Sequence, residues 1–417
     1  MDVPSLEGAK AAATLRNHSF RRLWIAQFST VTVIYSLSLS GAALVEERTR
    51  SSMQIGLVIL SAVLPAFLGS LISGAVVDRF GRKRVLLASH MARAVVSLAF
   101  WAGTLLLSPS LAMVMVYLAN VAMALFTQFA TPAELAMLPD LVGSPHLVSA
   151  NALFQMSMLA AEGLGIIVLS PVLIKVFGPP SVGLVGAILC LLGVTLVSTL
   201  PQDRLPASQA SSGKSIWREL AADFQTGWQV ISRDRLLRLV AIQATLAAAV
   251  LLVLLSLLPG LLSRHLGLSI ADAPILILPG GLGFVLGSIA ISRWGNRMGR
   301  PGTIAAGLVG LGVSIGLLSL ASSQPGRLWL ILPVILGMGV MLALVIISAR
   351  VILQEHPPAE VRGRVIAAQL AMANAVAVLP ILLGGSLADQ VGILPVMVLL
   401  GLLAIGAGLL GLRQAHR

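Results

Sequence analysis

The chain has 417 residues, of which 57% are hydrophobic and 11% are charged, and its mean hydropathy is +0.96. Soluble proteins average about a quarter charged residues, so this composition excludes a soluble globular protein and indicates a polytopic α-helical membrane protein. The net charge of +12 fits cations placed beside anionic lipid, so nucleic acid is not expected as a partner.

Twelve apolar runs, each long enough to span a bilayer, follow one another along the chain. The first six are expected near 24–45, 54–77, 85–107, 110–131, 150–174 and 181–200. The second six are expected near 236–262, 273–292, 301–321, 328–350, 364–388 and 391–412. The longest polar connection, 201–235, separates the two sets, so residues 1–200 and 236–417 are the expected halves.

The connection 201–235 begins with Pro, Ser and Gln residues and then becomes periodic. Apolar side chains recur every three or four residues in its second part: Ile216, Leu220, Phe224, Trp228 and Ile231. This spacing predicts an amphipathic helix in the cytoplasmic membrane interface, with Trp217 and Trp228 as anchors.

Lysine and arginine are unevenly distributed among the connections. If the N-terminus lies in the cytoplasm, cytoplasmic segments hold 22 of the 28 cations, outer loops hold five, and Arg93 lies within the third span. The positive-inside rule therefore predicts a multi-pass protein of the cell membrane with both termini in the cytoplasm.

The two halves repeat at a constant offset of 214 residues, and the matches extend over four expected helices. The matching positions are Leu64-Pro65 with Leu278-Pro279, Leu68-Gly69 with Leu282-Gly283, Arg79-Phe80-Gly81 with Arg293-Trp294-Gly295, Lys83 with Arg297, Gln155 with Gln369, and Gly178 with Gly392. One offset over so long a range predicts two duplicated six-helix halves.

The connection after the second span reads GAVVDRFGRKR, residues 74–84. In the loop after helix 2 of a twelve-span repeat, this stretch resembles the signature of the major facilitator superfamily. The matching residues are Gly74, Asp78, Arg79, Gly81, Arg82 and Lys83. The resemblance implies an all-α fold of twelve transmembrane helices in two pseudo-symmetric six-helix halves.

Four further stretches resemble one branch of that superfamily, the macrolide-efflux-like exporters, which also contains siderophore exporters and relatives of lysophospholipid transporters. They are NHSFRRLWIAQ at 17–27, TPAELAMLPDLVGSPHLVSANALFQ at 131–155, DFQTGWQVISRDRLLRL at 223–239 and LQEHPPAEVRGRVIAAQ at 353–369. The resemblance extends over essentially the whole chain and implies an exporter.

In the superfamily, the aspartate of the loop after helix 2 holds the two halves together in one conformation. The resemblance therefore implies that Asp78 is a conformational latch that engages the start of the eleventh helix. A carboxylate beside a helix N-terminus is favourable by about 0.3–1 kcal/mol at an exposed site, and Gly74 and Gly81 would permit close backbone approach. The alternative is that the cations of this loop only set the topology.

Glu162 is the only acid expected deep within a span. A charge there costs roughly 2.5–3.5 kcal/mol on insertion scales, so the carboxyl is expected to face protein or water. Such a group suits the loading and release of a proton; alternatively it attracts a cationic substrate or is a neutral packing residue. Arg93 lies in the cytoplasmic third of the third span, where resemblance implies a latch network and the alternative is a structural cation that reaches the interface.

Polar side chains also follow one face of the first and fourth spans. The resemblance places helices 1, 4, 7 and 10 around a central cavity. Polar residues of helices 1, 4 and 7 are therefore candidates for the lining of this cavity: Ser29, Thr32, Tyr35, Ser36, Asn120, Thr127 and Gln243. The alternative is that these residues pack helices together in lipid. The tenth span has almost no polar side chain, which favours an amphipathic or hydrophobic substrate.

We therefore expect a secondary transporter that exports small amphipathic compounds, such as drugs or macrolides, by proton antiport and alternating access, as a monomer in the bilayer. The alternatives are a lysophospholipid or siderophore transporter and a facilitator without proton coupling. In the fifth span, where antiporters of the superfamily often carry a Gly-Pro-x-x-Gly-Gly motif, only Pro171 matches. The 6 histidines are scattered and enzyme motifs are absent from the sequence, so no catalysis, cofactor or metal is expected.

Overall fold

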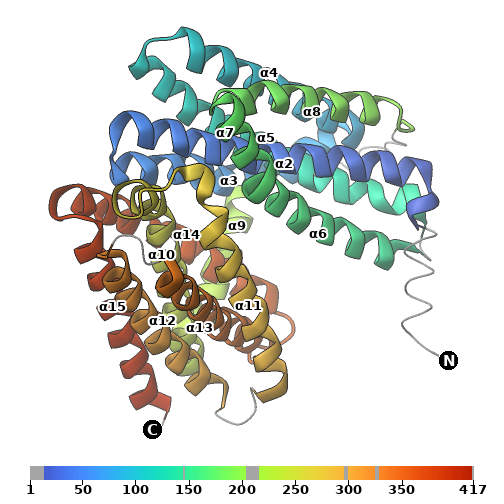
Figure 1. Cartoon of the computed structure of the whole chain (residues 1–417). Coiled ribbons are helices and arrows are strands. Elements are labelled where there is room, and N and C mark those ends of the chain that lie inside the picture. Colours follow the sequence, from blue (N-terminus) through green and yellow to red (C-terminus); the bar gives the residue numbers. More distant parts are fainter. Residues whose placement is uncertain (1–13, 144–145, 203–215, 295–298, 325–327, 416–417) are drawn as a thin grey trace. The chain divides into compact units, whose positions relative to one another are not determined.

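The computed structural model of the chain describes residues 14–143, 146–202, 216–294, 299–324 and 328–415 (Figure 1). Within these ranges every regular element is a helix. Eleven helices are long and apolar enough to cross a membrane among the described residues. The second expected span lies in a further helix, α3 (Ser52–Phe80), whose apolar part is Ser52–Ala66. The prediction of an all-α membrane fold is therefore confirmed.

The chain forms two compact units. The first comprises Met1–Arg48 and Leu60–Ala210, and the second comprises Thr49–Ile59 and Ser211–Arg417. The helices of the first unit, including most of α3, are α2 (His18–Thr49), α4 (Arg82–Leu106), α5 (Pro109–Val142), α6 (Leu147–Gly163), α7 (Ser170–Phe177) and α8 (Ser181–Ser198). A π-helical turn, η2 (Leu164–Leu169), joins α6 to α7.

The second unit, like the first, is a succession of long helices joined by short connections. Its helices are α9 (Ile216–Arg233), α10 (Arg235–Gly260), α11 (Pro274–Trp294), α12 (Arg300–Ser322), α13 (Leu328–Glu355), α14 (Arg362–Val391) and α15 (Ile393–Ala415), with short turns η3 (Leu261–His265) and η4 (Ile270–Asp272) between α10 and α11. The first turns of α3 belong to this unit.

The expected repeat is visible in the backbone. Pro65 lies inside α3 and Pro279 inside α11, at the predicted offset. Gly178 and Gly392 each end a helix with a positive φ, 82° and 96° respectively, a conformation that favours glycine. The second copy of the loop motif lies at 292–297: its first three residues end α11, and 295–297 lie outside the described residues.

The fourth helix is longer than expected. The predicted span ended near residue 131, but α5 continues to Val142 with Pro132 and Pro139 inside it. A proline removes one backbone hydrogen bond, and neighbouring helices in a bundle can hold the chain helical past it. This extension brings Glu134 and Asp140 into the helix.

The predicted periodicity in 201–235 corresponds to α9. Ile231 packs into the hydrophobic core of the second unit with residues of α10, α12, α13 and α14. A Cβ at Gly227 would collide with the Arg364 carbonyl oxygen, so α9 lies directly against the start of α14. Phe224 and Trp228 are 44% and 42% exposed, and their place in a membrane interface stays a prediction; the Trp217 side chain lies outside the described residues.

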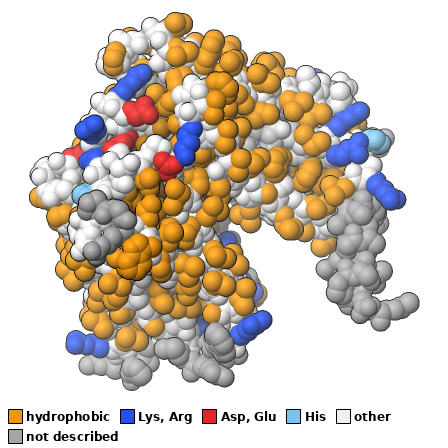
Figure 2. Space-filling model, viewed as in Figure 1, with side chains coloured by type: hydrophobic (Ala, Val, Ile, Leu, Met, Phe, Trp, Pro, Cys, Tyr) orange, Lys and Arg blue, Asp and Glu red, His pale blue; other side chains and the backbone are white. Residues whose placement is uncertain are grey.

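Large apolar side chains cover much of the described surface, as Figure 2 shows for one face. Leu106, Val148 and Leu159 are 82%, 84% and 73% exposed. Exposure on this scale is unfavourable in water and favourable against lipid tails. The surface therefore agrees with a protein that is solvated by a bilayer.

Candidate functional site

The structure brings two of the predicted site residues together. Glu162 lies near the C-terminal end of α6, and its carboxylate is within hydrogen-bonding reach of the Tyr35 hydroxyl on α2. Both side chains are half-buried. A phenol can donate to a carboxylate and reorganise when that carboxylate gains a proton, so this pair is suited to proton binding.

A π-helical turn directly follows this pair. Over Leu164–Leu169 the helix widens, and the Ser36 Oγ of α2 donates to the Gly165 carbonyl at 3.1 Å. In return, the Ser170 Oγ donates to the Ser36 carbonyl at 3.1 Å. A Cβ at Gly165 would lie 2.6 Å from the Thr32 carbonyl oxygen, so the two backbones are in direct contact. The turn therefore holds α2 and α6 in register beside Tyr35 and Glu162, and such π turns are frequent at functional sites.

Most of the other predicted lining residues are engaged in helix packing. Their polar groups donate to carbonyls of their own helix or of a neighbouring one: Ser29 to Ile25 at 2.8 Å, Thr32 to Phe28 at 2.8 Å, Asn120 to Val116 at 3.0 Å, Thr127 to Met123 at 2.6 Å, and Gln243 to Ala407 at 3.4 Å. Thr127 is half-buried, and the rest are at most 8% exposed. These hydrogen bonds agree with the packing alternative, and the lining of a central cavity by these residues stays a prediction; Gln243 contacts α15.

The first unit contains a buried charged cluster. One of its members, Arg93, was predicted from the sequence, and another, Glu134, was not. Arg93 on α4 is 2% exposed and Glu134 on α5 is 3% exposed, and the two interact electrostatically. The Arg93 Nη2 donates to the Phe126 carbonyl at 3.0 Å, while its Nε has no hydrogen-bond partner in the described part of the chain. One turn away, His90 is fully buried, and neither of its ring nitrogens has a described partner.

The expectation that Glu162 would be the only acid deep within a span is therefore wrong. Glu134 escaped notice because the fourth span was ended before Pro132. A usable signal was present, since the apolar face of α5 continues through Ala130, Ala133 and Met137, all of which are buried. Arg93 is enclosed by protein rather than reaching to an interface, and its place in a latch network stays a prediction.

The cations of the loop motif bind the ends of neighbouring helices. Arg82 Nη1 donates to the Ala136 carbonyl at 2.7 Å and to Asp140 Oδ2 at 2.6 Å. Lys83 Nζ donates to the Ser198 carbonyl at 2.8 Å and to the Leu200 carbonyl. Cations are favourable near helix C-termini, so these two residues tie the start of α4 to the ends of α5 and α8.

The remaining motif residues lie at the end of α3. Gly81 has a φ of 86°, which explains the glycine there. Gly74, Asp78 and Arg79 are exposed, and the Arg79 guanidinium lies 5.6 Å from the Phe80 ring centroid. The close backbone approach expected at Gly74 stays a prediction. The latch role of Asp78 stays a prediction.

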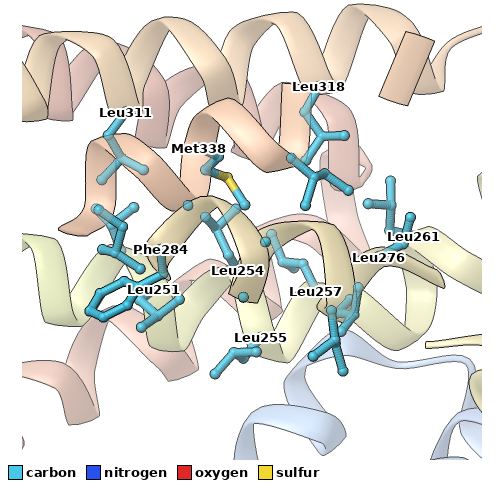
Figure 3. Close-up of a pocket in the computed structure, with 18 of the residues that line it drawn as sticks. Leu251, Leu254, Leu255, Leu257, Leu261, Leu276, Phe284, Leu311, Leu318 and Met338 are labelled. Atoms are coloured by element: carbon cyan, nitrogen blue, oxygen red, sulfur yellow. The ribbon is translucent and has the colours of Figure 1, made fainter. Parts of the chain in front are cut away.

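The second unit contains an apolar cavity of about 270 Å³ (Figure 3). Helices α10, α11 and α13 supply most of its lining, with residues from α12 and α15. Every lining residue is Leu, Ile, Val, Met, Phe or Gly. Figure 3 shows Leu251, Leu254, Phe284 and Met338 around this space. Such a cavity can exclude water from an apolar group but offers no side-chain hydrogen bond.

Among the described residues, no group of three or more His, Cys, Asp or Glu side chains could hold a metal ion. Cys190 is a buried free thiol in α8 and lies close to Arg93.

Long apolar helices in two repeated units, with buried ionisable groups and an apolar cavity, define a polytopic membrane transporter. The sequence profile of the Major Facilitator Superfamily matches residues 23–381, and the chain belongs to this family. Its fold is that of the family, with two pseudo-symmetric sets of six helices.

Known proteins agree on the fold. The crystal structure of the nucleoside transporter NupG is similar, with a TM-score of 0.76 and 15% identity over 95% of this chain and 98% of that chain. A bacterial homologue of the human lysosomal transporter Spinster, in an inward-facing and unoccupied conformation, gives a TM-score of 0.70 and 14% identity over 95% and 97%. These TM-scores establish a shared fold, and at 14–15% identity the similarity carries no statement about the substrate.

Sequence relatives include exporters. The enterobactin exporter EntS of Salmonella choleraesuis (strain SC-B67) is 27% identical over 145 residues, which is 34% of this chain and 34% of that protein. EntS of Shigella boydii serotype 18 is 28% identical over the same shares of the two chains. The similarity thus covers about a third of the length of these curated relatives.

Proposed function

We propose that this transporter is a secondary active exporter of small amphipathic compounds, driven by proton antiport and working by alternating access. The observation that carries the proposal is the wholly apolar cavity of the second unit. A sugar or a phosphate would lose its hydration there without compensating hydrogen bonds, whereas an apolar substrate moiety gains from burial. The direction of transport is supported by the similarity to exporters.

In this proposal Glu162 is the proton carrier and Tyr35 is its hydrogen-bonding partner. Loading of a proton removes the charge from a carboxyl that is half-buried in a membrane helix, and release restores the charge. The phenol of Tyr35 can follow both states because a hydroxyl both donates and accepts. Asp78 acts as the latch on the cytoplasmic side, and both chain termini lie in the cytoplasm.

The second candidate is a siderophore transporter of the same superfamily. It is favoured by the similarity to enterobactin exporters over 145 residues. The two candidates differ in what the substrate must offer, because a siderophore carries many polar groups and the described cavity provides none. The two further alternatives are a lysophospholipid transporter and a facilitator without proton coupling, and the same experiment tests both.

The test is proton movement in sealed proteoliposomes that contain a pH-sensitive dye. Macrolides, lipophilic cations, lysolipids and a catecholate siderophore are added in turn under an imposed pH gradient, to the wild type and to Glu162→Gln. We expect a macrolide or lipophilic cation to trigger proton flux in the wild type and none in Glu162→Gln. Thr195→Val, which removes an exposed hydroxyl bonded to its own helix, is the control and should retain the flux.

Each other result has a definite meaning. Flux that survives in Glu162→Gln removes that residue from the coupling role. Flux with the siderophore alone favours the second candidate. If every compound leaves the internal pH unchanged while lysolipid movement is detected, proton antiport is wrong for this protein.

A further inference from the structure

The end of α14 repeats the spacing of the loop motif at the end of α3. The first stretch reads GAVVDRFG at 74–81, and the second reads GSLADQVG at 385–392. In both, a glycine precedes the aspartate by four residues and another glycine follows it by three. Gly81 and Gly392 both stop their helices with positive φ, 86° and 96°. These two stretches are not related by the offset of 214, so the second one is separate from the duplication of the halves.

The aspartate of the second stretch is bound to the start of α3. Asp389 Oδ1 accepts from the Ser52 backbone N–H at 2.7 Å. Its Oδ2 accepts from the Met53 backbone N–H at 3.1 Å and from the Ser51 Oγ at 2.6 Å. A carboxylate in this position satisfies unpaired N–H groups of a helix N-terminus and complements the helix dipole. Asp389 therefore caps a helix that is more than 300 residues distant in sequence.

A cation from a third helix completes this cluster. Arg264, in the turn that follows α10, places Nη1 3.9 Å from Asp389 Oδ1. Its Nη2 donates to the Ser52 Oγ at 3.3 Å. The carboxylate is thus held between a helix N-terminus and a guanidinium, which both offer hydrogen-bond donors or positive charge to its oxygens.

The two helices also meet backbone to backbone. A Cβ at Gly385 would lie 2.7 Å from the Met53 Cα and 2.8 Å from its nitrogen. One turn along, a Cβ at Gly56 would lie 2.9 Å from the Ile381 Cγ2. Glycine at both positions is what allows this approach, and any larger side chain would push the helices apart.

Two features set the first turns of α3 apart from the helices around them: the unit to which they belong and the backbone conformation of the residue before them. Thr49–Ile59 belongs to the second unit, whereas α2 and the remainder of α3 belong to the first. Just before α3, Arg50 has a φ of 48°, and it is the only non-glycine residue of the described ranges with a positive φ. A left-handed arginine is unfavourable and marks a sharp, locally strained connection between α2 and α3.

We propose that Asp389 is the carboxylate of a second latch, which holds the first turn of α3 to the end of α14 in one state of the transport cycle and releases it in the other. The proposal rests on the alternating-access function proposed above. Because α3 runs from this contact into the first unit, a movement that separates the ends of α3 and α14 must break the Asp389 hydrogen bonds. The predicted topology places this latch on the outer face of the membrane, opposite Asp78.

The first test measures whether loss of the carboxylate opens the contact. Ile55, which is 1% exposed in α3, is replaced by cysteine in a Cys190→Ser background, and its labelling by a membrane-impermeant maleimide is timed in intact cells. Asp389→Ala should raise the labelling rate by roughly 3- to 30-fold, the factor expected when a helix N-cap is lost. Asp389→Asn, which keeps one acceptor oxygen, should give a smaller rise. Gln390→Ala, on the same helix end, is the matched control and should give none.

A purely structural cap would behave differently in the second test. Ser51→Cys and Asp389→Cys are combined in the Cys190→Ser background, so that oxidation joins the two helices covalently. We expect oxidation to reduce substrate-triggered proton flux to the level of empty vesicles and a thiol reductant to restore it. Full flux in the oxidised protein, with the disulfide verified by mass spectrometry, would overturn the latch.

The two tests separate failure of this proposal from failure of the proposed function. Maleimide labelling needs no substrate, so it reports on the latch even if none of the compounds is transported. An unchanged labelling rate in Asp389→Ala, in protein that retains wild-type thermal stability, contradicts the latch by itself.

Discussion

The two units are built from the same repeat, but they bury different chemistry. In the first unit, Glu46, His90, Arg93 and Glu134 are all at most 3% exposed. Among the described residues of the second unit, no charged side chain or histidine is buried to this degree, and the buried polar residues there are neutral. The second unit instead contains the apolar cavity.

This difference shows that a duplicated fold can divide its tasks. Backbone features of the repeat are preserved in both units, as the paired prolines of α3 and α11 and the paired glycines 178 and 392 show. Side chains in the interior are free to diverge, provided that each unit keeps its helices packed. The first unit buries ionisable side chains, and the second contains the apolar cavity.

The largest expected effect is on the two buried ionisable side chains of the first unit, Arg93 and Glu134, which interact electrostatically. Arg93→Met and Glu134→Gln should each lower stability by about 3–5 kcal/mol, because each leaves one charge or one set of polar groups buried without its partner. The double variant Arg93→Met/Glu134→Leu should recover most of this loss. Thermal unfolding in detergent, followed by circular dichroism, measures all three.

The matched control for this pair lies in the second unit. Gln243 is 2% exposed and makes one long hydrogen bond to α15, so Gln243→Met should cost only about 1 kcal/mol. If Gln243→Met is as damaging as Arg93→Met, the contrast between the charged and the neutral interior has no energetic meaning.

The next effect concerns the apolar cavity. Met338→Trp places a larger side chain in the cavity and should raise KM for an amphipathic substrate roughly tenfold, since it removes space for apolar contact. Leu320→Trp, at a position of α12 that is 66% exposed, adds the same bulk outside the cavity and should leave KM unchanged. Equal KM values for the two variants would exclude the cavity as the binding site. Initial rates of substrate uptake into proteoliposomes provide KM.

A smaller loss of stability is expected from substitution of Asp234, which caps the N-terminus of α10 in the second unit. Its Oδ1 accepts from the Leu237 N–H at 2.8 Å, and its Oδ2 lies 3.1 Å from the His356 Nε2. Burial raises the pKa of Asp234, but the hydrogen bonds from Leu237 and His356 outweigh it and hold this pKa below its usual value. Asp234→Ala should cost about 0.5–2 kcal/mol at neutral pH, as the loss of an N-cap does.

The pH dependence of that variant follows from the lowered pKa. A carboxyl whose folded pKa is depressed stabilises the protein above its unfolded pKa of about 3.9, and this contribution is lost as the pH falls through the folded value. The difference in melting temperature between the wild type and Asp234→Ala should therefore shrink as the pH falls below 4. A difference that grows below pH 4 would contradict this assignment.

The smallest effects should come from two related ion pairs. Arg82, the first residue of α4, pairs with Asp140 at the end of α5, and Arg300, the first residue of α12, pairs with Glu355 at the end of α13. Both pairs are largely exposed, so each carboxylate contributes only about 0.2–1 kcal/mol. Arg82 also binds the Ala136 carbonyl, so Arg82→Ala should destabilise more than Arg300→Ala in the same melting assay. The reverse order would show that the two units do not use this arrangement alike.

Some features of the site could be predicted from the sequence because they depend on local pattern. Glu162 stands out as an acid in an apolar run, and Tyr35 shares a helix face with other polar residues. Their proximity depends on how α2 meets α6, and the π turn at Leu164–Leu169 that sets this contact has no simple sequence signal. For Glu134, the predicted span ended too early, since α5 stays helical past Pro132 to Val142.

The polar stripe of the first span shows the limit of face-based prediction. The spacing of Ser29, Thr32 and Ser36 correctly places them on one face, but periodicity does not say what that face meets. In the structure these hydroxyls are satisfied by backbone carbonyls and pack against neighbouring helices.

By itself, the sequence determined the membrane environment, the helical class, the order of the helices and the duplication. These follow from hydrophobic length, cation placement and a single repeat offset, which are all properties of neighbouring residues or of simple counting. Only the tertiary structure decided which side chains influence one another: Tyr35 bonds to Glu162, Arg93 feels the charge of Glu134, and Asp389 binds the first turn of α3. Each of these contacts joins segments far apart in the chain, and its geometry depends on close helix packing that no local pattern encodes.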